Sequence, residues 1–194
     1  MAELVGLLVM AYGTASGLED VERYYTDIRG GRAPGPDALK DLKARYAAIG
    51  NRSPLADITR EQAARLEQKL NAANEDTRFR SYVGYKHASP FVADVAREMA
   101  ADGIHRAVGI VMAPHYSRMS IGSYIERVEG ARPQDLDVDV IESWHDHPTF
   151  LDVLASRVES ALHAVPPEER DRALVVFTAH SLPTRILEWG DPYP

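Results

Sequence analysis

The sequence predicts a doubly wound α/β fold with a mostly parallel sheet, and three observations support this. The run at residues 4–12 is nearly all apolar, without the alternation of a half-exposed strand, which is typical of a parallel strand covered on both faces, and four further runs rich in Val, Ile, Tyr or Phe follow it. Stretches with helical spacing of apolar residues lie between these runs. The alternating order implies right-handed crossovers, which place helices on both faces of the sheet.

Five apolar runs are predicted to be strands. They are residues 4–12, 79–86, 107–114, 138–143 and 173–179. Four stretches between them have the apolar spacing of helices: Ile58, Ala63, Leu66 and Leu70; Val92, Val95, Ala96 and Met99; Ile121, Ile125 and Val128; and Leu151, Leu154, Val158 and Leu162.

The helix boundaries are predicted from capping residues. Thr59 with Gln62 fits a capping box. Proline is expected at the first helical position after Ser89 and after His147, where its missing N–H leaves no bond unmade. Gly50 and Gly103 are expected to end helices.

Composition excludes several classes of protein. The chain has 194 residues, of which 45% are hydrophobic and 26% charged, as in ordinary globular proteins. A net charge of −7 argues against bulk binding of nucleic acid, and the absence of cysteine excludes an iron–sulfur cluster or a disulfide built from this chain. No apolar run is long enough for a transmembrane segment and no leader is evident, so we expect a cytoplasmic protein.

A linker-like stretch, AVPPEE at residues 164–169, predicts a domain boundary. We therefore expect a first α/β domain over residues 1–168. Residues 169–194 would then hold the first strand and loop of a second, incomplete domain.

Ligand sites in open α/β sheets lie at the carboxyl ends of the strands. The residues that follow the predicted strands are Tyr12, Lys86, His87, His115, Tyr116, Trp144, His145, His180 and Ser181. A single histidine at such a place is more often a hydrogen-bonded structural residue than a ligand, but four of the seven histidines gather at this edge.

Two other patterns near this edge bear on cofactor and metal binding. The loop from Gly13 to Gly17 lacks the three-glycine register of a dinucleotide fingerprint, which predicts no nucleotide cofactor. His145 and His147 have the H-x-H spacing of a metal clip, whereas Pro148 favours His147 as a helix cap.

A basic segment interrupts the acidic chain. Residues 29–52 contain six basic and two acidic side chains, with three tyrosines nearby: Tyr24, Tyr25 and Tyr46. Arginine pairs with carboxylates and stacks on rings, so a flat, carboxylated aromatic ligand fits this segment. Part of the charge is also expected to be a solvated helix face, since Lys40 and Lys43 lie one turn apart.

Several motifs, in order along the chain, resemble the ferrochelatases, closest to the coproporphyrin type of Gram-positive bacteria. They are LLVMAYGT (7–14), ERYYTDIRGGR (22–32), LKARYAAIG (42–50), SPLADIT (53–59), APHYS (113–117), SY (123–124), AHSLP (179–183) and GDPYP (190–194). Tyr12, where porphyrin-type relatives usually carry another residue, favours the coproporphyrin branch.

The resemblance implies a chelatase-like fold and insertion of Fe²⁺ into coproporphyrin III, giving Fe-coproporphyrin III in haem biosynthesis. Coproporphyrin III and ferrous iron are then substrates, and no resident cofactor is implied. His180 is implied as metal ligand and proton acceptor, and Tyr12 as the residue axial to the iron of the product. Contacts to the macrocycle and its propionates are implied for Arg29, Arg45, Tyr46, Ser53 and Tyr124.

The sequence departs from the family pattern in two ways. Ala15 stands where proline is common, a change expected to loosen the first loop. The family also folds as two similar domains, with a glutamate facing the histidine from the second, and the 194 residues stop before that position. We expect a fragment or a reading frame ended early, and a monomer when full length.

Two alternatives to iron insertion stay open at this point. One is a module that binds porphyrin or haem without inserting metal. The other is a related chelatase that handles cobalt or nickel with a tetrapyrrole, because His180 alone does not set metal choice.

Overall fold

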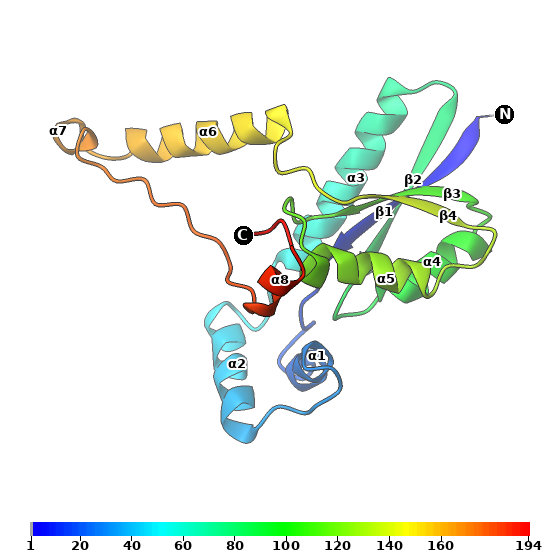
Figure 1. Cartoon of the computed structure of the whole chain (residues 1–194), viewed down its shortest axis with the longest axis horizontal. Coiled ribbons are helices and arrows are strands. Elements are labelled where there is room, and N and C mark those ends of the chain that lie inside the picture. Colours follow the sequence, from blue (N-terminus) through cyan, green and yellow to red (C-terminus); the bar gives the residue numbers. More distant parts are fainter. Residues whose placement is uncertain (1) are drawn as a thin grey trace.

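The computed structural model describes residues 2–194, and its central feature is a four-stranded, all-parallel sheet in the order β2-β1-β3-β4 (Figure 1). The elements are β1 Glu3–Ala11, α1 Val21–Ile28, α2 Pro36–Ala48, α3 Leu55–Ala73, β2 Thr77–Tyr85, α4 Val92–Ala101, β3 Arg106–Val111, the π-helix η1 Arg118–Gly122, α5 Ser123–Glu129, β4 Asp137–Ile141, α6 Pro148–His163, α7 Pro167–Arg170 and α8 Arg185–Glu188. Among these residues, no helix is long and apolar enough to cross a membrane.

Strand β1 alternates its side chains between two apolar layers. Leu8 and Met10 join the core formed with α4 and α5, while Leu7 and Val9 join the core formed with α3. Ala63 of α3 is buried in the same core as Leu7 and Val9. Helices therefore cover both faces of the sheet, and the predicted doubly wound α/β fold is confirmed.

The register of β1 and β2 brings their carboxyl ends side by side. The pairing runs in parallel from Glu3↔Thr77 to Ala11↔Tyr85. It continues past the strands, since the Lys86 N–H donates to the Ala11 carbonyl at 2.9 Å. The residues that follow β1 and β2 are thereby fixed as neighbours.

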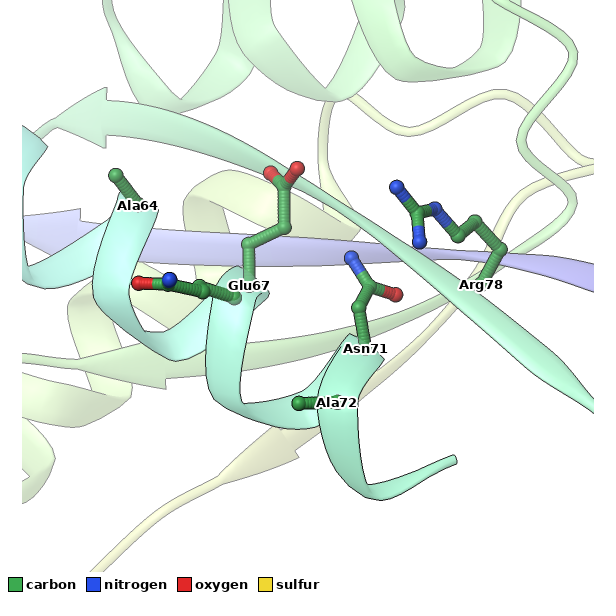
Figure 2. A pocket seen from close by; sticks show the side chains of 6 residues that line it. Ala64, Glu67, Asn71, Ala72 and Arg78 are labelled. Carbon is green, nitrogen blue, oxygen red and sulfur yellow. The ribbon is translucent and has the colours of Figure 1, made fainter. Parts of the chain in front are cut away.

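Side chains of α3 cover the outer edge of β2, which is an edge strand with no further strand to pair with in the described sheet (Figure 2). The Asn71 amide accepts from the Phe79 N–H at 2.7 Å and donates to the Phe79 carbonyl at 2.9 Å. Glu67 accepts from the N–H and hydroxyl of Ser81 at 2.7 and 2.6 Å. These bonds occupy backbone groups that an uncovered edge would offer to another chain. The shallow hollow lined by Glu67, Asn71 and Arg78 is thus a structural feature of the edge.

The fifth predicted strand, residues 173–179, is wrong for this structure. These residues are extended but make no ladder, and Leu174, Val176 and Phe177 are 85, 69 and 79% exposed. A strand needs a neighbouring backbone to receive its hydrogen bonds, and β4 is left as the second edge of the sheet. Apolar composition indicates that a segment can form a strand, but not whether another strand lies beside it.

Helix α6 extends away from the sheet and has no buried residue (Figure 1). Its first turn, with Phe150 and Val153, lines an apolar hollow of about 820 Å³ together with Ile110 and Met112. The helix predicted at this place is confirmed, but its apolar stripe is not packed against the core.

Two predicted helix starts are wrong, and the other boundaries are confirmed. Helix α3 begins before Thr59, whose hydroxyl donates to the Leu55 carbonyl at 2.8 Å inside the helix. Helix α4 begins at Val92, because the Pro90 carbonyl instead accepts from the Tyr85 N–H at 2.8 Å. His147 and Pro148 start α6 as predicted. Gly50 and Gly103 follow helices with positive φ, as predicted for C-terminal stops.

Candidate active site

Tyr12, His87 and Asp27 form a contiguous group at the carboxyl ends of β1 and β2. The rings of Tyr12 and His87 lie 4.6 Å apart with a tilt of 56°. His87 is buried, and its Nδ1 lies 2.6 Å from Oδ1 of Asp27 on α1. Tyr12 itself is 44% exposed, so one side of its ring rests on the imidazole while the rest is open to a ligand.

His87 is held as a neutral imidazole. Burial lowers its pKa, and the nearby Lys86 ammonium acts in the same direction against the opposing effect of Asp27. Because a carboxylate only accepts, Nδ1 carries the proton and donates it to Asp27. The contact is therefore a hydrogen bond to an anion near pH 7, and it fixes the tautomer and orientation of the ring beneath Tyr12.

Lys86, which follows β2, contacts the first residues of α5. Its ammonium hydrogen-bonds the Ser123 hydroxyl and lies 5.1 Å from the centre of the Tyr124 ring. Burial lowers the pKa of Lys86, and the Arg127 guanidinium lowers it further. Tyr124 is buried, which raises the pKa of its phenol. Among the residues predicted to contact the macrocycle, Tyr124 thus lies next to a cation.

The loop after β1 rests on two buried tyrosines, Tyr24 and Tyr46. The Tyr24 hydroxyl donates to the Gly13 carbonyl at 3.1 Å, and the Tyr46 hydroxyl shares a 2.7 Å bond with the Thr14 hydroxyl. The Ala15 N–H donates to the Tyr46 hydroxyl at 3.1 Å, a bond that proline could not make. Ala15 is fully buried.

Gly13 is required where β1 turns into this loop. Its φ is +90°, and a Cβ at this position would lie 2.8 Å from the Cβ of Ala88. A side chain is excluded by both the backbone conformation and the space. The close approach keeps the loop against the end of β2 and leaves Tyr12 at the surface.

The predicted arginines, Arg29 and Arg45, are exposed at the end of α1 and on α2. Arg29 follows α1, with its guanidinium 5.7 Å from the centre of the Tyr25 ring. Arg45 on α2 pairs with Asp41 at 2.7 Å in a solvent-exposed contact. Such a surface pair is weak and can be exchanged for another carboxylate.

Ser53 lies at the start of α3, where its hydroxyl accepts from the Leu55 N–H at 3.3 Å. It lines a narrow hollow of about 170 Å³ beside the loop that follows β1. Thr14 and Tyr85 line the same hollow, which places Ser53 next to the end of β1.

His180 is not joined to the Tyr12 group by any contact among the described residues. It is exposed, and its Nδ1 lies 2.7 Å from the Ser181 carbonyl. A carbonyl can only accept, so Nδ1 carries the proton and Nε2 keeps its lone pair. That tautomer is the one in which a neutral imidazole binds a metal or takes a proton through Nε2.

The other predicted histidines lie at the ends of β3 and β4. The rings of His115 and His145 are 5.2 Å apart, and Tyr193 meets His115 edge-on at 6.4 Å. His145 also hydrogen-bonds the Ser143 hydroxyl at 2.7 Å, while His147 precedes α6. In residues 2–194 no group of three or more His, Asp or Glu side chains is arranged to hold a metal ion.

Three residues of the site were not singled out from the sequence. Asp27 lies within the motif ERYYTDIRGGR and Ser123 within the motif SY, but nothing in the sequence assigns a contact to either side chain. Asp191 belongs to the GDPYP motif, yet its 2.9 Å contact joins it to Ser117, which lies 74 residues earlier in the chain. Only the folded backbone brings these residues to the edge of the sheet.

The family model described as Ferrochelatase matches residues 4–194. The chain belongs to the ferrochelatase family. Relatives in that family include the protein named coproporphyrin III ferrochelatase of Geobacillus kaustophilus (strain HTA426), which is 51% identical over 191 residues, 97% of this chain and 60% of the relative. The protein of the same name from Bacillus subtilis (strain 168) is 50% identical over 192 residues, 98% of this chain and 62% of the relative.

A third ferrochelatase relative, coproporphyrin III ferrochelatase 1 of Bacillus anthracis, is 46% identical over 196 aligned residues, covering 100% of this chain and 63% of the relative. The chain therefore spans about three fifths of the length of the curated ferrochelatases it matches. The four-stranded parallel sheet is the chelatase-like fold expected from the sequence.

Proposed function

We propose that this chain carries the porphyrin-binding and metal-ligating residues of a coproporphyrin III ferrochelatase, which inserts Fe²⁺ into coproporphyrin III in haem biosynthesis. The observation that carries the proposal is the group of Tyr12, His87 and Asp27 at the open edge of the sheet. It occurs in a chain about half identical to proteins named for this reaction.

Substrate binding follows from the shape and charge of the edge. Tyr12 offers an exposed ring whose orientation is fixed from below by His87. The guanidinium groups of Arg29 and Arg45 are exposed and able to pair with propionate carboxylates, since arginine binds carboxylates in a bidentate manner. The local positive charge opposes the overall charge of −7 and favours an anionic porphyrin at this place alone.

Metal insertion replaces two pyrrole N–H protons by four bonds from nitrogen to iron. The ferrous ion brings two positive charges and the two released protons carry two away, so the charge of the macrocycle core does not change. A neutral imidazole with a free Nε2 suits two successive tasks on this route: it binds Fe²⁺ before transfer and, once the metal has left, accepts one of the two protons, while the other passes to solvent. We assign these tasks to His180, whose Nδ1 is already occupied by the Ser181 carbonyl.

The test is anaerobic metallation of coproporphyrin III. The chain is mixed with the porphyrin and Fe²⁺, and the loss of free-porphyrin fluorescence is followed against a protein-free control. The proposal predicts protein-dependent loss that is slowed at least about tenfold in His180→Ala, the effect of removing a general base. Metallation by His180→Ala at the parent rate would remove the assigned role. Parallel arms with Co²⁺ and Ni²⁺ identify the metal that is inserted.

A second candidate function is porphyrin or haem binding without metal insertion. It is favoured by the exposure of His180 and by the lack of any described contact between its side chain and the Tyr12 group. In the same assay it predicts a bound porphyrin that keeps its free-base spectrum after Fe²⁺ is added. Conversion to the iron porphyrin spectrum excludes this candidate.

A further inference from the structure

Asp191 joins the segment that follows His180 to the sheet domain. Its Oδ2 accepts from the Ser117 hydroxyl at 2.9 Å and from the Arg118 N–H at 2.8 Å. Its Oδ1 accepts from the Tyr193 N–H at 3.0 Å. Both carboxylate oxygens are thus used, and Ser117 is fully buried at the contact.

Other contacts hold the same docked segment, residues 186–193. Ile186 is buried, and the Trp189 ring lies 5.5 Å from the Arg118 guanidinium. The Tyr193 hydroxyl donates to the His180 carbonyl at 2.9 Å. The backbone of His180 is therefore tied, through Tyr193, to the segment that Asp191 fixes.

The segment before His180 offers no comparable restraint. Residues 173–182 contain no helix or strand, and they run back from α7 toward α8 as an extended chain (Figure 1). The side chain of His180 is bonded only to the carbonyl of its own neighbour, Ser181. The contacts that fix His180 relative to the sheet therefore come from residues that follow it in the chain.

The π-helix η1 connects the Asp191 contact to the porphyrin-facing edge. Ser117 precedes η1 and its hydroxyl accepts from the Met119 N–H at 3.2 Å while donating to Asp191. At the other end of the five-residue helix, Ser123 contacts Lys86 and is followed by the buried Tyr124. One short helix of a rare type thus spans the distance between the docked segment and the Lys86–Tyr124 contact.

From this arrangement we propose that Asp191 is a positioning residue, which holds the His180 segment on η1 so that the imidazole faces a porphyrin bound at Tyr12. The inference rests on the proposed function, because it assumes that a porphyrin occupies that edge. Asp191 contacts neither substrate; it acts through Tyr193 on the His180 backbone. Releasing it should leave porphyrin binding unchanged and displace His180.

The experiment uses ferric coproporphyrin III, whose paramagnetic iron broadens the signals of nearby protons. The chain is labelled in its histidine rings, and the His180 signal is assigned by its disappearance in His180→Gln. Zinc coproporphyrin III provides the diamagnetic reference. In the parent chain the His180 signal is expected to broaden in the ferric complex, whereas the signal of His163 on α6 serves as an internal comparison.

Asp191→Ala is expected to bind the porphyrin with unchanged affinity, to lose the His180 broadening, and to show faster amide exchange over residues 186–193. Ser117→Ala removes the partner hydroxyl and is expected to act in the same direction, and Asp191→Asn, which keeps one acceptor oxygen, should fall between. Glu188→Ala is the matched control, because Glu188 lies in the same segment and makes no side-chain hydrogen bond or ion pair within the described part of the chain.

The outcomes separate the two proposals. If the parent chain shows no absorbance change with coproporphyrin III, the proposed function fails. If the porphyrin binds but His180 is not broadened in the parent, or is broadened equally in Asp191→Ala and Ser117→Ala with unchanged far-ultraviolet circular dichroism, the positioning role of Asp191 is wrong. Equal amide exchange in the parent and in both variants overturns it as well.

Discussion

The Tyr12 ring lies 4.6 Å from the ring of His87, which donates a 2.6 Å hydrogen bond to Asp27. This relationship joins the end of β1, the end of β2 and helix α1 in one chain of contacts. It leaves Tyr12 partly exposed while the supporting imidazole is buried. A flat ligand that docks on Tyr12 therefore meets a side chain whose position is already fixed.

Tyr12→Phe separates the role of the Tyr12 ring from that of its oxygen. The phenylalanine keeps the ring on His87, so free coproporphyrin III should bind with nearly the parent affinity. Ferric coproporphyrin III should bind several-fold more weakly, because the axial oxygen is lost. The two dissociation constants are measured by absorbance titration, and an equal effect on both porphyrins would contradict an axial role for Tyr12.

Asp27→Ala removes the partner of a buried imidazole. The free energy of unfolding is expected to fall by about 1 to 3 kcal/mol, the cost of an unsatisfied buried polar group. The pKa of His87 should fall further, because Asp27 is the neighbour that favours the protonated ring. Urea denaturation measures the first effect and histidine titration by NMR measures the second.

The control for that prediction is Asp37→Ala. Asp37 lies exposed in the first turn of α2, so its removal should change stability by no more than about 0.5 kcal/mol. A loss of stability as large in Asp37→Ala as in Asp27→Ala would mean that the hydrogen bond between His87 and Asp27 makes no specific contribution to stability.

Asn71→Ala tests the covering of the β2 edge. The substitution frees the N–H and carbonyl of Phe79, and we expect a loss of about 1 to 2 kcal/mol together with a greater tendency to aggregate. Glu61→Ala on the same helix breaks only the exposed pair with Arg65 and should cost less than about 0.5 kcal/mol. Denaturation midpoints and light scattering of the two variants give the comparison; indistinguishable variants would show that the edge is not protected by Asn71.

The hydrogen bonds to Asp191 predict a pH dependence of protein stability that is confined to acidic pH. Burial alone would raise the pKa of Asp191, but hydrogen bonds from the Tyr193 N–H, the Ser117 hydroxyl and the Arg118 N–H lower it below its ordinary 3.8. A lowered folded-state pKa adds stability that is fully present above the ordinary value and is lost as the pH falls through the lowered one. The stability difference between the parent and Asp191→Asn should therefore stay constant from pH 7 to about 5 and shrink below about 4. A difference that already shrinks near pH 6 would assign the effect to another group.

The fold was largely predictable from the sequence, because the first apolar run is buried on both faces of the sheet and the next three apolar runs pair in parallel beside it or beside its neighbour. The run at residues 173–179 has the same composition and is exposed, since no strand among residues 2–194 lies beside it. Thr59 and Pro90 show the same limit on a smaller scale. Each fits a helix start by residue type, yet the hydroxyl of Thr59 donates to the Leu55 carbonyl inside α3, and the Pro90 carbonyl accepts from the Tyr85 N–H before α4 begins.

The candidate site was predictable where a residue directly follows a strand. Tyr12 and His87 meet as expected because the parallel register of β1 and β2 forces them together. Asp27 and Ser123 reach the edge from helices, and Asp191 reaches it from a distant segment, so their contacts depend on packing that local sequence does not encode. The roles of Tyr12, Arg29, Arg45, Tyr46, Ser53, Tyr124 and His180 stay predictions.

An absorbance titration of the chain with coproporphyrin III tests for a porphyrin site at the ends of β1 and β2. Saturable binding is expected for the parent, and binding at least about tenfold weaker, or about 1.4 kcal/mol, in Tyr12→Ala and in Arg29→Ala. Asp37→Ala serves as the control and should bind like the parent. No saturable binding by the parent, or unchanged affinity in both variants, would contradict a porphyrin site at the ends of β1 and β2.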